Sequence, residues 1–411
     1  MAVDALVMGL GRFGGGLAAA EGLLAEGQRV LVTDLAEESA FQASVDALRK
    51  AFGEQVTFKL GGHDENDFAH TKMVIANPAV PKPWDNPYLK VAWAAGATVS
   101  TEIARTLGQL HSCPTIAITG SAGKSTTTAM THAALVAAGF PATRGGNLGG
   151  SLLDTPQGHA IVVELSSAMA WWLYKAPGAP KPRFEVALRT NLAPNHLDWH
   201  GDLEHYADCK QALLDHAGTA LDGSTISPFS GNLLVPGQHN RINAAAALAA
   251  ASALYPDRDA QDFIPGVESF GGLPHRLERV EVPHFPDNGF WNDSKATTAE
   301  AVELAIAAVR EKGPVRLIAG GKGKGTDLGP LCELFDQCIK TYTIGEIGEE
   351  LHTRSQGPCM QTMTLDAAVA AATSELSPGE QLLLSPGATS WDQFENYERR
   401  GEAFKTLVRH P

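Results

Sequence analysis

A glycine-rich loop followed by a lysine and hydroxyl residues is the most informative chemical pattern in the sequence. It lies in the stretch AITGSAGKSTTTAM, residues 117–130, between an apolar run and a segment with helical spacing. In such a loop, successive backbone N–H groups and the helix N-terminus bind phosphate oxygens. The lysine reaches the terminal phosphates, and a serine or threonine hydroxyl holds Mg²⁺. We therefore expect a nucleotide phosphate site formed by Gly120, Gly123, Lys124, Ser125 and Thr126.

The spacing of this loop limits the kinds of protein that fit. Two residues separate its glycines, in GSAGKST, whereas the commoner phosphate loop reads GxxxxGK[ST]. A glycine-rich turn that caps a helix is the structural alternative, but it gives no reason for the Lys-Ser-Thr triplet that follows. The loop alone does not say whether the phosphate serves a motor, a kinase, a switch or a ligase.

A second glycine pattern lies near the N-terminus. Gly9, Gly11 and Gly14 have GxGxxG spacing after an apolar run, and Asp34 ends the next apolar run, RVLVTD. This pattern is typical of a dinucleotide site in which the acidic residue accepts the ribose hydroxyl. A NAD-dependent oxidoreductase is therefore an alternative, although the pattern is weakly specific and accounts for nothing after residue 107.

Polar residues follow two further apolar runs of the chain. Glu164 follows the run AIVV, and His196, Asp198 and His200 form an HxDxH pattern after EVALRTNLAP. Ligands of open α/β sheets bind beyond the carboxyl ends of the strands, so these side chains are candidates for a site. HxDxH is also compatible with a zinc site or with a structural polar turn.

Composition excludes several classes of partner. The formal net charge is -14 and the pI about 5.4, which argues against a nucleic-acid partner bound by a general basic surface. The sequence contains no apolar run long enough to cross a bilayer and no basic n-region at its start, so we expect no membrane insertion. Five scattered cysteines without a CxxC pair are typical of a reducing cytosol, so we expect a cytoplasmic protein.

Alternating strand-like and helical segments predict an α/β protein of three domains, with boundaries at residues 1–107, 108–275 and 276–411. A Gly/Pro-punctuated loop at 271–278 resembles a hinge. The predicted strands include residues 115–120, 160–168, 185–200 and 381–387, and the clearest helix is the alanine-rich run 239–254.

The short phosphate loop, TGxxGKST, resembles that of the Mur ligase family and of the folylpolyglutamate synthases, which are ATP-dependent amide ligases. The segments VVELSSAMAWWL, TNLAPNHLDWH and GQHNRINAAAALAA are similar to family motifs and occur in the family's order. Four later segments resemble the branch that adds D-glutamate: GLPHRLE, NDSKATT, AGGKGKGTDL and LLSPGATSWDQFENYERRGEAF. The resemblance covers almost the whole chain.

The resemblance implies a Rossmann-like N-terminal domain for the UDP-sugar, a P-loop central domain for ATP, and a Rossmann-like C-terminal domain for the amino acid. The implied reaction joins D-glutamate to UDP-N-acetylmuramoyl-L-alanine through an acyl phosphate, during peptidoglycan precursor synthesis. Another amino-acid-adding Mur ligase or a folylpolyglutamate-type ligase is the alternative within the family. We expect the enzyme to act as a monomer.

The resemblance also assigns roles to residues. Lys124, His196 and Lys210 would act in catalysis, and a carbamylated Lys210 would join Ser125, Thr126, Glu164 and His196 around one or two Mg²⁺ ions. A surface lysine is the simpler interpretation of Lys210. The residues that would contact ATP outside the loop are Asn240, Asn243, Arg276 and Asp293.

A final group is expected to bind the two other substrates. The side chains or backbone atoms concerned belong to Gly9, Gly11, Gly14, Asp34, Asn77, Asn147, Lys295, Thr297, Lys324, Ser390 and Tyr397. Three features depart from the family pattern. Ala122 stands where Asn is frequent, Tyr397 stands where Phe is common, and the segment 221–240 is shorter than usual.

Overall fold

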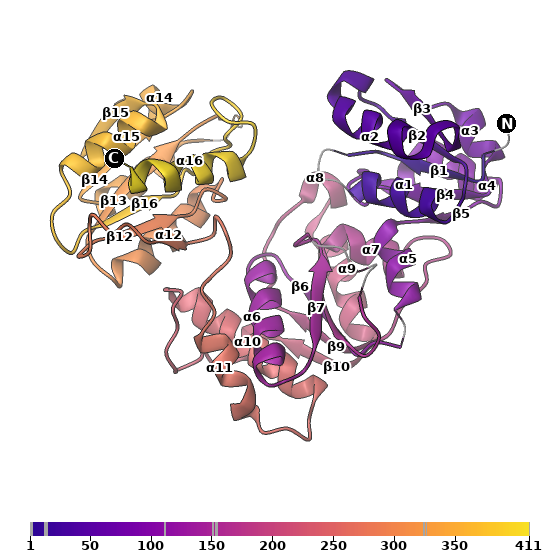
Figure 1. The fold of residues 1–411 in the computed structure, drawn as a ribbon, viewed down its shortest axis with the longest axis horizontal. Helices are drawn as coiled ribbons and strands as arrows, with labels where there is room; N and C mark the ends of the chain where they lie inside the picture. The colour runs from indigo at the N-terminus through magenta and orange to yellow at the C-terminus, as the bar shows by residue number, and fades with distance from the viewer. Residues whose placement is uncertain are drawn as a thin grey trace. The chain divides into compact units, whose positions relative to one another are not determined.

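The computed structural model describes residues 3–11, 15–110, 112–149, 152, 155–323, 325 and 327–410. The predicted substrate residues Gly14 and Lys324 lie outside the described residues. The chain divides into two compact units, one formed by Met1–Thr225 with Ala249–Ala260 and the other by Ile226–Leu248 with Gln261–Pro411. Three sheets with covering helices confirm the predicted three-domain α/β architecture (Figure 1). The boundaries proposed at residues 107 and 275 remain predictions.

The first unit contains two parallel sheets, and the N-terminal one has strand order β3-β2-β1-β4-β5. Order reverses at β1, where β2 lies on one side and β4 on the other. The strands are β1 (Ala5–Met8), β2 (Val30–Asp34), β3 (Val56–Leu60), β4 (Met73–Ala76) and β5 (Thr98–Ser100). The helices are α1 (Gly15–Ala25), α2 (Gln42–Phe52), α3 (Glu65–His70), α4 (Pro87–Ala94) and α5 (Glu102–Gln109), with short 3₁₀ turns η1 (Glu38–Ala40), η2 (Gly53–Gln55) and η3 (Pro83–Asp85).

Burial explains why the middle of this sheet was easy to predict. All four residues of β1 are buried because helices cover both faces of a parallel sheet. β3, at the sheet edge, alternates buried and exposed residues and has no continuous apolar run. The sequence analysis did not identify it.

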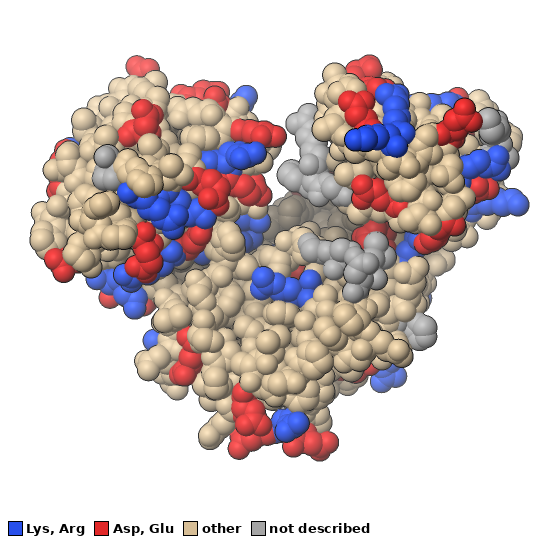
Figure 2. Space-filling model, viewed as in Figure 1, with Lys and Arg blue, Asp and Glu red and all other residues tan. Residues whose placement is uncertain are grey.

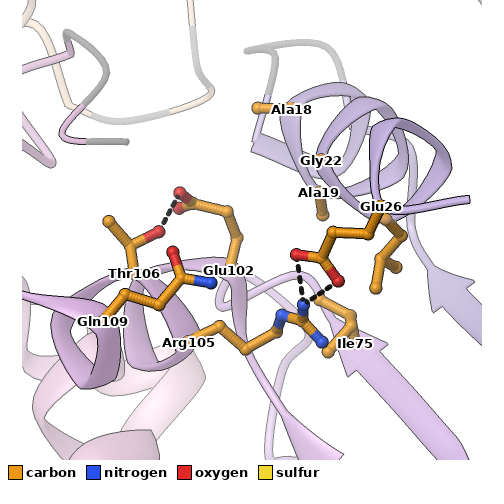
Figure 3. A pocket seen from close by; sticks show the side chains of 10 residues that line it. Ala18, Ala19, Gly22, Glu26, Ile75, Glu102, Arg105, Thr106 and Gln109 are labelled. Carbon is orange, nitrogen blue, oxygen red and sulfur yellow. Dashed lines mark hydrogen bonds and ion pairs between the residues drawn. The ribbon is translucent and has the colours of Figure 1, made fainter. Parts of the chain in front are cut away.

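Helix α5 connects the first sheet to the second. Its Ile103, Ala104 and Leu107 pack in the hydrophobic core of the central sheet. On its other side, Arg105 forms an ion pair at 2.9 Å with Glu26, which directly follows α1, beside a small pocket (Figure 3). Helix α5 therefore contacts both the N-terminal and the central domain of the first unit.

The central sheet is also parallel, with order β10-β9-β6-β8-β7. Its strands are β6 (Thr115–Thr119), β7 (Ala142–Gly146), β8 (Ala160–Glu164), β9 (Phe184–Arg189) and β10 (Ala217–Asp222). Its helices are α6 (Lys124–Ala137), α7 (Ser167–Tyr174), α8 (Leu197–His200) and α9 (Leu203–Asp215), followed by η4 (Gly223–Thr225). Because β6 lies in the centre, the phosphate loop that follows it has strand ends on both sides.

Two predicted strands are too long. The strand predicted at 160–168 ends at Glu164, and α7 begins at Ser167. The strand predicted at 185–200 ends at Arg189, and its last four residues form α8. In both cases the polar residues turn into the loops at the carboxyl end of the sheet instead of continuing the ladder.

Helix α10 (Gln238–Leu254) confirms the predicted alanine-rich helix, and its residues are divided between the two units. It is followed by η5 (Ala260–Phe263) and α11 (Ile264–Glu268). The shorter segment at 221–240 contains the end of β10 and η4, and no other strand is found between Ile226 and Gly237.

The second unit contains a six-stranded sheet of order β11-β12-β16-β13-β14-β15, in which β11 alone is antiparallel. Its strands are β11 (Glu278–Val280), β12 (Gly289–Asn292), β13 (Val315–Gly320), β14 (Lys340–Ile344), β15 (Cys359–Met363) and β16 (Gln381–Leu384). Its helices are α12 (Ala299–Arg310), α13 (Gly329–Glu333), α14 (Gly348–Arg354), α15 (Leu365–Ser374) and α16 (Tyr397–Arg409), with η6 (Leu334–Gln337).

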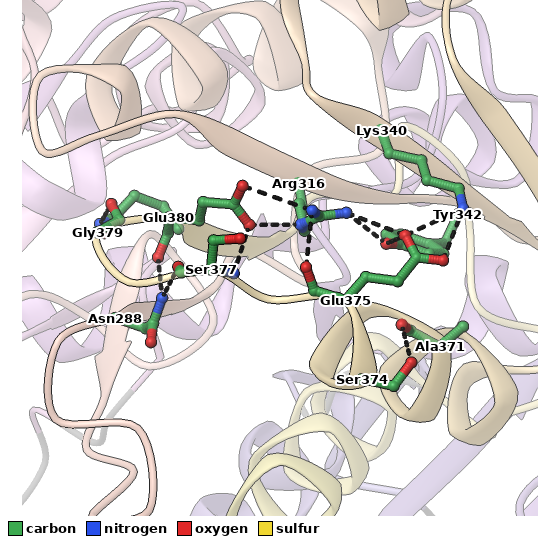
Figure 4. A network of polar contacts seen from close by, with 11 residues as sticks. Asn288, Arg316, Lys340, Tyr342, Ala371, Ser374, Glu375, Ser377, Gly379 and Glu380 are labelled. Carbon is green, nitrogen blue, oxygen red and sulfur yellow. Dashed lines mark hydrogen bonds and ion pairs between the residues drawn. The ribbon is translucent and has the colours of Figure 1, made fainter.

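A buried arginine links the amino ends of these strands. Arg316, near the start of β13, donates to Glu380 at 2.7 Å and to Glu375 at 3.1 Å (Figure 4). It also donates to the Tyr342 hydroxyl at 2.9 Å, and Lys340 reaches Glu375 at 2.8 Å. This network lies at the end of the sheet opposite to the end that faces ligands in open α/β folds, so its role is structural.

Charged residues of both signs are mixed on the face of the molecule drawn in Figure 2. Within the described part of the chain, no helix combines the length and apolar character needed to span a bilayer.

Replacing Arg316 by alanine should lower the free energy of unfolding by about 3 kcal/mol, because Glu380 would remain half-enclosed without its partner. Urea unfolding of the full chain measures this loss. The matched control is Arg354→Ala, since Arg354 pairs with Asp327 and Glu350 at the exposed surface and its removal should change stability little. Equal losses in the two variants would contradict a structural role for the network.

Candidate active site

The phosphate loop connects the carboxyl end of β6 to the first turn of α6. Gly120 has a φ of 146°, and a Cβ there would lie 1.9 Å from Oγ1 of Thr190, so glycine is required at this position. Gly123 has a φ of 79° and precedes Lys124, the first residue of α6. The backbone N–H groups at the start of α6 therefore stand at the loop, in the arrangement expected for anion binding.

Two residues of the β9–α8 loop hold the phosphate loop in place. Thr190 donates its hydroxyl to the Ala122 carbonyl at 2.6 Å. Asn191 accepts the Ala122 N–H at 2.9 Å and donates to the same carbonyl at 3.1 Å. The sequence analysis did not assign a role to either residue. Their signal is the Thr-Asn pair that directly follows the apolar strand β9.

Lys124 and Lys210 reach the phosphate loop from different helices. The Nζ atom of Lys124 donates to the carbonyls of Gly120 and Ser121, at 3.0 and 3.2 Å. Lys210, on α9, donates to the Gly120 carbonyl at 2.9 Å and to the Thr119 hydroxyl at 3.2 Å. Its side chain is 1% exposed, so the interpretation of Lys210 as a surface lysine is wrong.

Because Lys210 is buried, its ammonium group loses a proton more readily than that of an exposed lysine. Desolvation, with the positive charge of Lys124 nearby, lowers the pKa of Lys210 from 10.5 to about 7. The ring of Tyr206 covers its ammonium group at 4.7 Å, and Tyr206 is itself hydrogen bonded to Ser121 of the loop. Near neutral pH a substantial fraction of this amine is therefore unprotonated and nucleophilic.

Glu164 lies at the carboxyl end of β8, next to the loop strand β6. It is fully buried, and Oε1 accepts a hydrogen bond from Asn147 at 2.9 Å. Its other carboxylate oxygen, Oε2, is buried without a hydrogen-bond partner. A buried carboxylate oxygen without a partner is unfavourable unless a cation or a donor completes it. Ser125, at the start of the neighbouring helix, is also buried, whereas Thr126 is half-buried.

His196 precedes α8 in a left-handed backbone conformation, with φ 51° and ψ 36°. Desolvation and the charges of Lys124 and Lys210 lower its pKa, which indicates that the imidazole lies within electrostatic reach of both lysines. His196 and Asp198 do not gather with His200 as potential metal ligands. Among the described residues, the group of ligand atoms that does gather consists of His200, His205 and Cys209.

The N-terminal sheet forms a second candidate site at its switch point. The glycine loop follows β1, and Asn77 follows the neighbouring strand β4, so the two lie at the reversal of strand order. The carboxylate of Asp34 accepts the Leu10 N–H at 2.9 Å, which fixes the glycine loop from the end of β2. A small pocket beside the loop is lined by Gly15, Gly16, Asn77 and Pro78.

Gly16 is a close-packing residue that the sequence analysis missed. A Cβ at this position would lie 2.1 Å from the Gly9 carbonyl oxygen, so helix α1 can approach the glycine loop only with glycine there. Gly9 and Gly11 stand against Asn77, and the predicted binding role of these three residues remains a prediction. The signal for Gly16 was the GGG run at 14–16, in which spacing alone could not choose the packed residue.

In the second unit, Asp293 follows β12 at the carboxyl end of the sheet. Its carboxylate accepts hydrogen bonds from the Ser385 hydroxyl at 2.8 Å and from the Leu277 N–H at 3.1 Å. Desolvation raises the pKa of Asp293 to about 7, against the lowering effect of these bonds and of Arg276. Arg276 therefore lies within electrostatic reach of Asp293, and the role of both residues at ATP remains a prediction.

The described residues among those expected around the amino acid, which exclude Lys324, lie at the same end of this sheet. Lys295 stands 4.8 Å from the ring centre of Tyr397, and the Ser294 hydroxyl donates to the Tyr397 carbonyl at 2.8 Å. Ser390 is buried, and its carbonyl accepts from Phe394. Thr297 lies two residues beyond Lys295, before α12. The structure thus brings Lys295 and Tyr397 together.

Asn240 and Asn243 share one face of α10, as their spacing predicts. The Asn243 amide donates to Oδ1 of Asn240 at 3.3 Å, and the Asn240 amide donates to the Pro236 carbonyl at 2.7 Å. Both side chains are buried, so the pair fixes the start of the helix within its own unit.

Comparison with known families identifies the central domain. Residues 118–221 match the model of the Mur ligase middle domain. The UDP-N-acetylmuramoylalanine--D-glutamate ligase of Geobacter metallireducens is 34% identical over 98% of this chain and 96% of its own length. The enzyme of the same name from a Synechococcus species is 32% identical, over 98% of both chains.

Solved structures show the same fold at low sequence identity. UDP-N-acetylmuramate-alanine ligase from Thermotoga maritima aligns over 98% of both chains, with a TM-score of 0.60 and 16% identity. A MurF ligase from the same organism, in complex with ADP, aligns over 99% of this chain and 95% of its own, with a TM-score of 0.58 and 15% identity.

The lowered pKa of Lys210 predicts a pH dependence of stability. Between pH 7 and 10 the unfolded chain binds about one proton more than the folded chain, because only the folded lysine has lost its proton. The free energy of unfolding should therefore rise with pH in this window, by at most about 1.4 kcal/mol per pH unit from this group. Unfolding in carbon-dioxide-free buffer, compared with Lys210→Met, isolates the contribution.

The Lys210→Met variant should lack this rise, so the difference between wild type and variant should shift in favour of wild type as pH increases. The exposed Lys175, replaced by methionine, is the control and should keep the wild-type slope. Parallel curves for wild type and Lys210→Met would show that the amine titrates normally.

Proposed function

The chain belongs to the Mur ligase family, and on that basis we propose that it is the ATP-dependent ligase that adds D-glutamate to UDP-N-acetylmuramoylalanine in peptidoglycan precursor synthesis. The observation that carries this proposal is similarity to D-glutamate ligases over 98% of the chain. A dehydrogenase with a GxGxxG loop would share only the first sheet. Five unpaired cysteines are compatible with a cytoplasmic location.

The reaction needs an activated carboxylate and an amine. The γ-phosphoryl group of ATP passes to the carboxylate of the alanine residue, which forms an acyl phosphate and ADP. The amine of D-glutamate then attacks the acyl carbon, phosphate leaves with its electron pair, and the amine loses a proton. Because no protein nucleophile is involved, catalysis consists of positioning and of neutralising phosphate charge.

The phosphate loop is the proposed site of the ATP phosphates. Its glycines and the N-terminus of α6 offer N–H groups, and Lys124 already reaches across the loop to Gly120 and Ser121. On ATP binding the Lys124 ammonium would exchange these carbonyls for phosphate oxygens. The further residues proposed to contact the nucleotide, as the family resemblance implies, are Asn240, Asn243, Arg276 and Asp293.

The residues beside the loop fit Mg²⁺. The unpartnered Oε2 of Glu164 is a hard oxygen ligand, and the Ser125 or Thr126 hydroxyl is a second, at the same edge of the sheet. His196 completes the proposed set. Bound there, the ion would reduce the negative charge of the phosphates. Glu164, held by Asn147, supplies its binding oxygen in a fixed orientation.

Lys210 is the proposed site of carbamylation. Its unprotonated amine would attack carbon dioxide, lose one proton and form an anionic carbamate. This anion would replace a buried cation that Lys124 disfavours, so the change is electrostatically favourable. The carbamate oxygens would then serve as further metal ligands near His196.

The remaining substrates are assigned by domain. The UDP-sugar is proposed to bind at the glycine loop, through Gly9, Gly11, Gly14 and Asp34, with Asn77 and Asn147. D-Glutamate is proposed to bind in the third domain. There, Lys295, Thr297, Lys324, Ser390 and Tyr397 offer the cationic and hydroxyl groups that a dicarboxylic amino acid needs.

Phosphate release from ATP tests the ligase assignment. With UDP-N-acetylmuramoyl-L-alanine present, release should depend on D-glutamate and should be much weaker with L-glutamate or with other amino acids. When the alanine carboxylate carries ¹⁸O, one labelled oxygen should appear in the released phosphate. Release that needs neither the acceptor nor an amino acid, or phosphate without label, would overturn the acyl-phosphate mechanism.

Replacing Glu164 by glutamine should raise the Mg²⁺ concentration needed for half-maximal phosphate release by about 10- to 100-fold, because an amide oxygen carries no full charge. The measured quantity is the Mg²⁺ concentration that gives half-maximal activity. Glu185→Gln is the control, since Glu185 lies on β9 at the opposite end of the same sheet, where it accepts a hydrogen bond from the Thr115 N–H. An unchanged Mg²⁺ requirement in Glu164→Gln would exclude Glu164 as a ligand.

A further inference from the structure

Three potential metal ligands converge behind the phosphate site. His200 ends α8, while His205 and Cys209 lie one turn apart on α9. His200 and Cys209 are buried, and His205 is half-buried. The ligase reaction described above gives none of these three residues a role.

The distances within this cluster are close to those of a metal site. One candidate ligand atom from each of the three residues lies within 4.8 Å of the other two. Nδ1 of His200 is hydrogen bonded to Nδ1 of His205 at 2.9 Å, and Sγ of Cys209 lies 4.0 Å from Nδ1 of His200 and from Nε2 of His205. Around a tetrahedral zinc ion, two nitrogens would be about 3.4 Å apart, and nitrogen and sulfur about 3.6 Å. Because the two short contacts of His205 involve different ring nitrogens, zinc binding would replace the hydrogen bond between the histidines. Side-chain rotation would then bring one nitrogen of each ring and the sulfur to these separations.

The hydrogen bond at the far side of His200 is compatible with the tautomer that zinc binding requires. Nε2 of His200 lies 2.8 Å from the Ser167 hydroxyl. When Nε2 carries the proton and donates it to Ser167, Nδ1 presents a lone pair to the cluster. Zinc-binding histidines are oriented in this way by a partner on the second ring nitrogen.

The surroundings of the cluster are largely aromatic. The ring of Trp84 stands 4.5 Å from that of His205, and the ring of Trp199 stands 4.5 Å from that of His200. Burial raises the pKa of the Cys209 thiol to about 12, and Asp208 acts in the same direction, while the charges of Lys175 and Lys210 oppose it. Without a metal ion the thiol therefore keeps its proton at neutral pH. A neutral or weakly charged assembly of one dication, one thiolate and two imidazoles suits this setting better than a free thiolate.

We propose that His200, His205 and Cys209 form a zinc site. Binding displaces the Cys209 thiol proton to solvent, and a water molecule on the half-buried side of His205 completes the tetrahedron. Nitrogen and sulfur ligands exclude Mg²⁺ as the preferred ion, because it takes oxygen ligands. The site is thus separate in chemistry from the oxygen-rich site at Glu164.

Zinc here would tie α8 to α9 directly before Lys210. The bond through Cys209 would hold the turn of α9 from which Lys210 reaches the phosphate loop, and the bond through His200 would hold the end of α8, four residues after His196. The role is one of positioning, and its test does not depend on ligase activity.

Cobalt substitution of the full chain tests the proposal. Chelator-treated protein is titrated with Co²⁺ in excess Mg²⁺, which occupies sites with oxygen ligands. We expect a thiolate-to-cobalt charge-transfer band in the near ultraviolet that saturates at one Co²⁺ per chain and disappears when Zn²⁺ is added. Zn²⁺ should also raise the melting temperature of the metal-free protein.

Variants connect the band to the three residues. Cys209→Ala and His205→Ala should each abolish the band and the stabilisation by Zn²⁺, while the partly exposed position of His205 makes that variant the safer one for folding. Cys338→Ala, at a buried cysteine of the other unit, is the matched control and should keep both signals. Absence of the band in the wild type, or its persistence in Cys209→Ala, would overturn the zinc site.

Discussion

The burial of the Lys210 ammonium group at the carboxyl end of β6 is the interaction on which the candidate site depends. A lysine amine that is 1% exposed needs acceptors for its N–H groups, and the acceptors here are the Gly120 carbonyl and the Thr119 hydroxyl. Thr119 ends β6, and Gly120 begins the phosphate loop. The loop conformation and the position of α9 are consequently linked, and a change in the charge of Lys210 acts directly on the nucleotide site.

The parallel sheet makes this convergence possible. Because β6 lies between β8 and β9, the loop after it is flanked by Glu164 on one side and by Thr190 and Asn191 on the other. The carboxyl edge of the central sheet therefore holds two lysines, Lys124 and Lys210, and the buried carboxylate of Glu164. Hydrogen-bond donors outnumber acceptors at this edge. Such an edge is suited to a polyanion with a divalent cation, which agrees with the nucleotide chemistry of the family.

In the other two domains, polar side chains also gather at the carboxyl ends of the strands, although the residues differ. At the N-terminal sheet, Asp34 holds the glycine loop at the point where strand order reverses. In the third domain, burial raises the pKa of Asp293 to about 7, so about half of this carboxyl is protonated at neutral pH. The opposite ends of the strands carry structural contacts, such as the Arg316 network. The proposed binding residues and the structural contacts therefore lie at opposite ends of the strands.

The three-domain α/β architecture, the phosphate loop and the alanine-rich helix could be predicted from the sequence, because buried parallel strands, glycine loops and helical spacing are local patterns. Edge strands such as β7, β10 and β15 were missed, since half-exposed polar residues carry no continuous apolar signal. The predicted ends of β8 and β9 lie too far along the chain, because the polar residues after these strands belong to loops and not to the sheet. Only the tertiary structure decided that Lys210 is buried and that His200 contacts Cys209. It also decided that Thr190 and Asn191 form hydrogen bonds with a loop about 70 residues earlier in the chain. Contacts between distant segments depend on how sheets and helices pack, and residue type and spacing do not encode that packing locally.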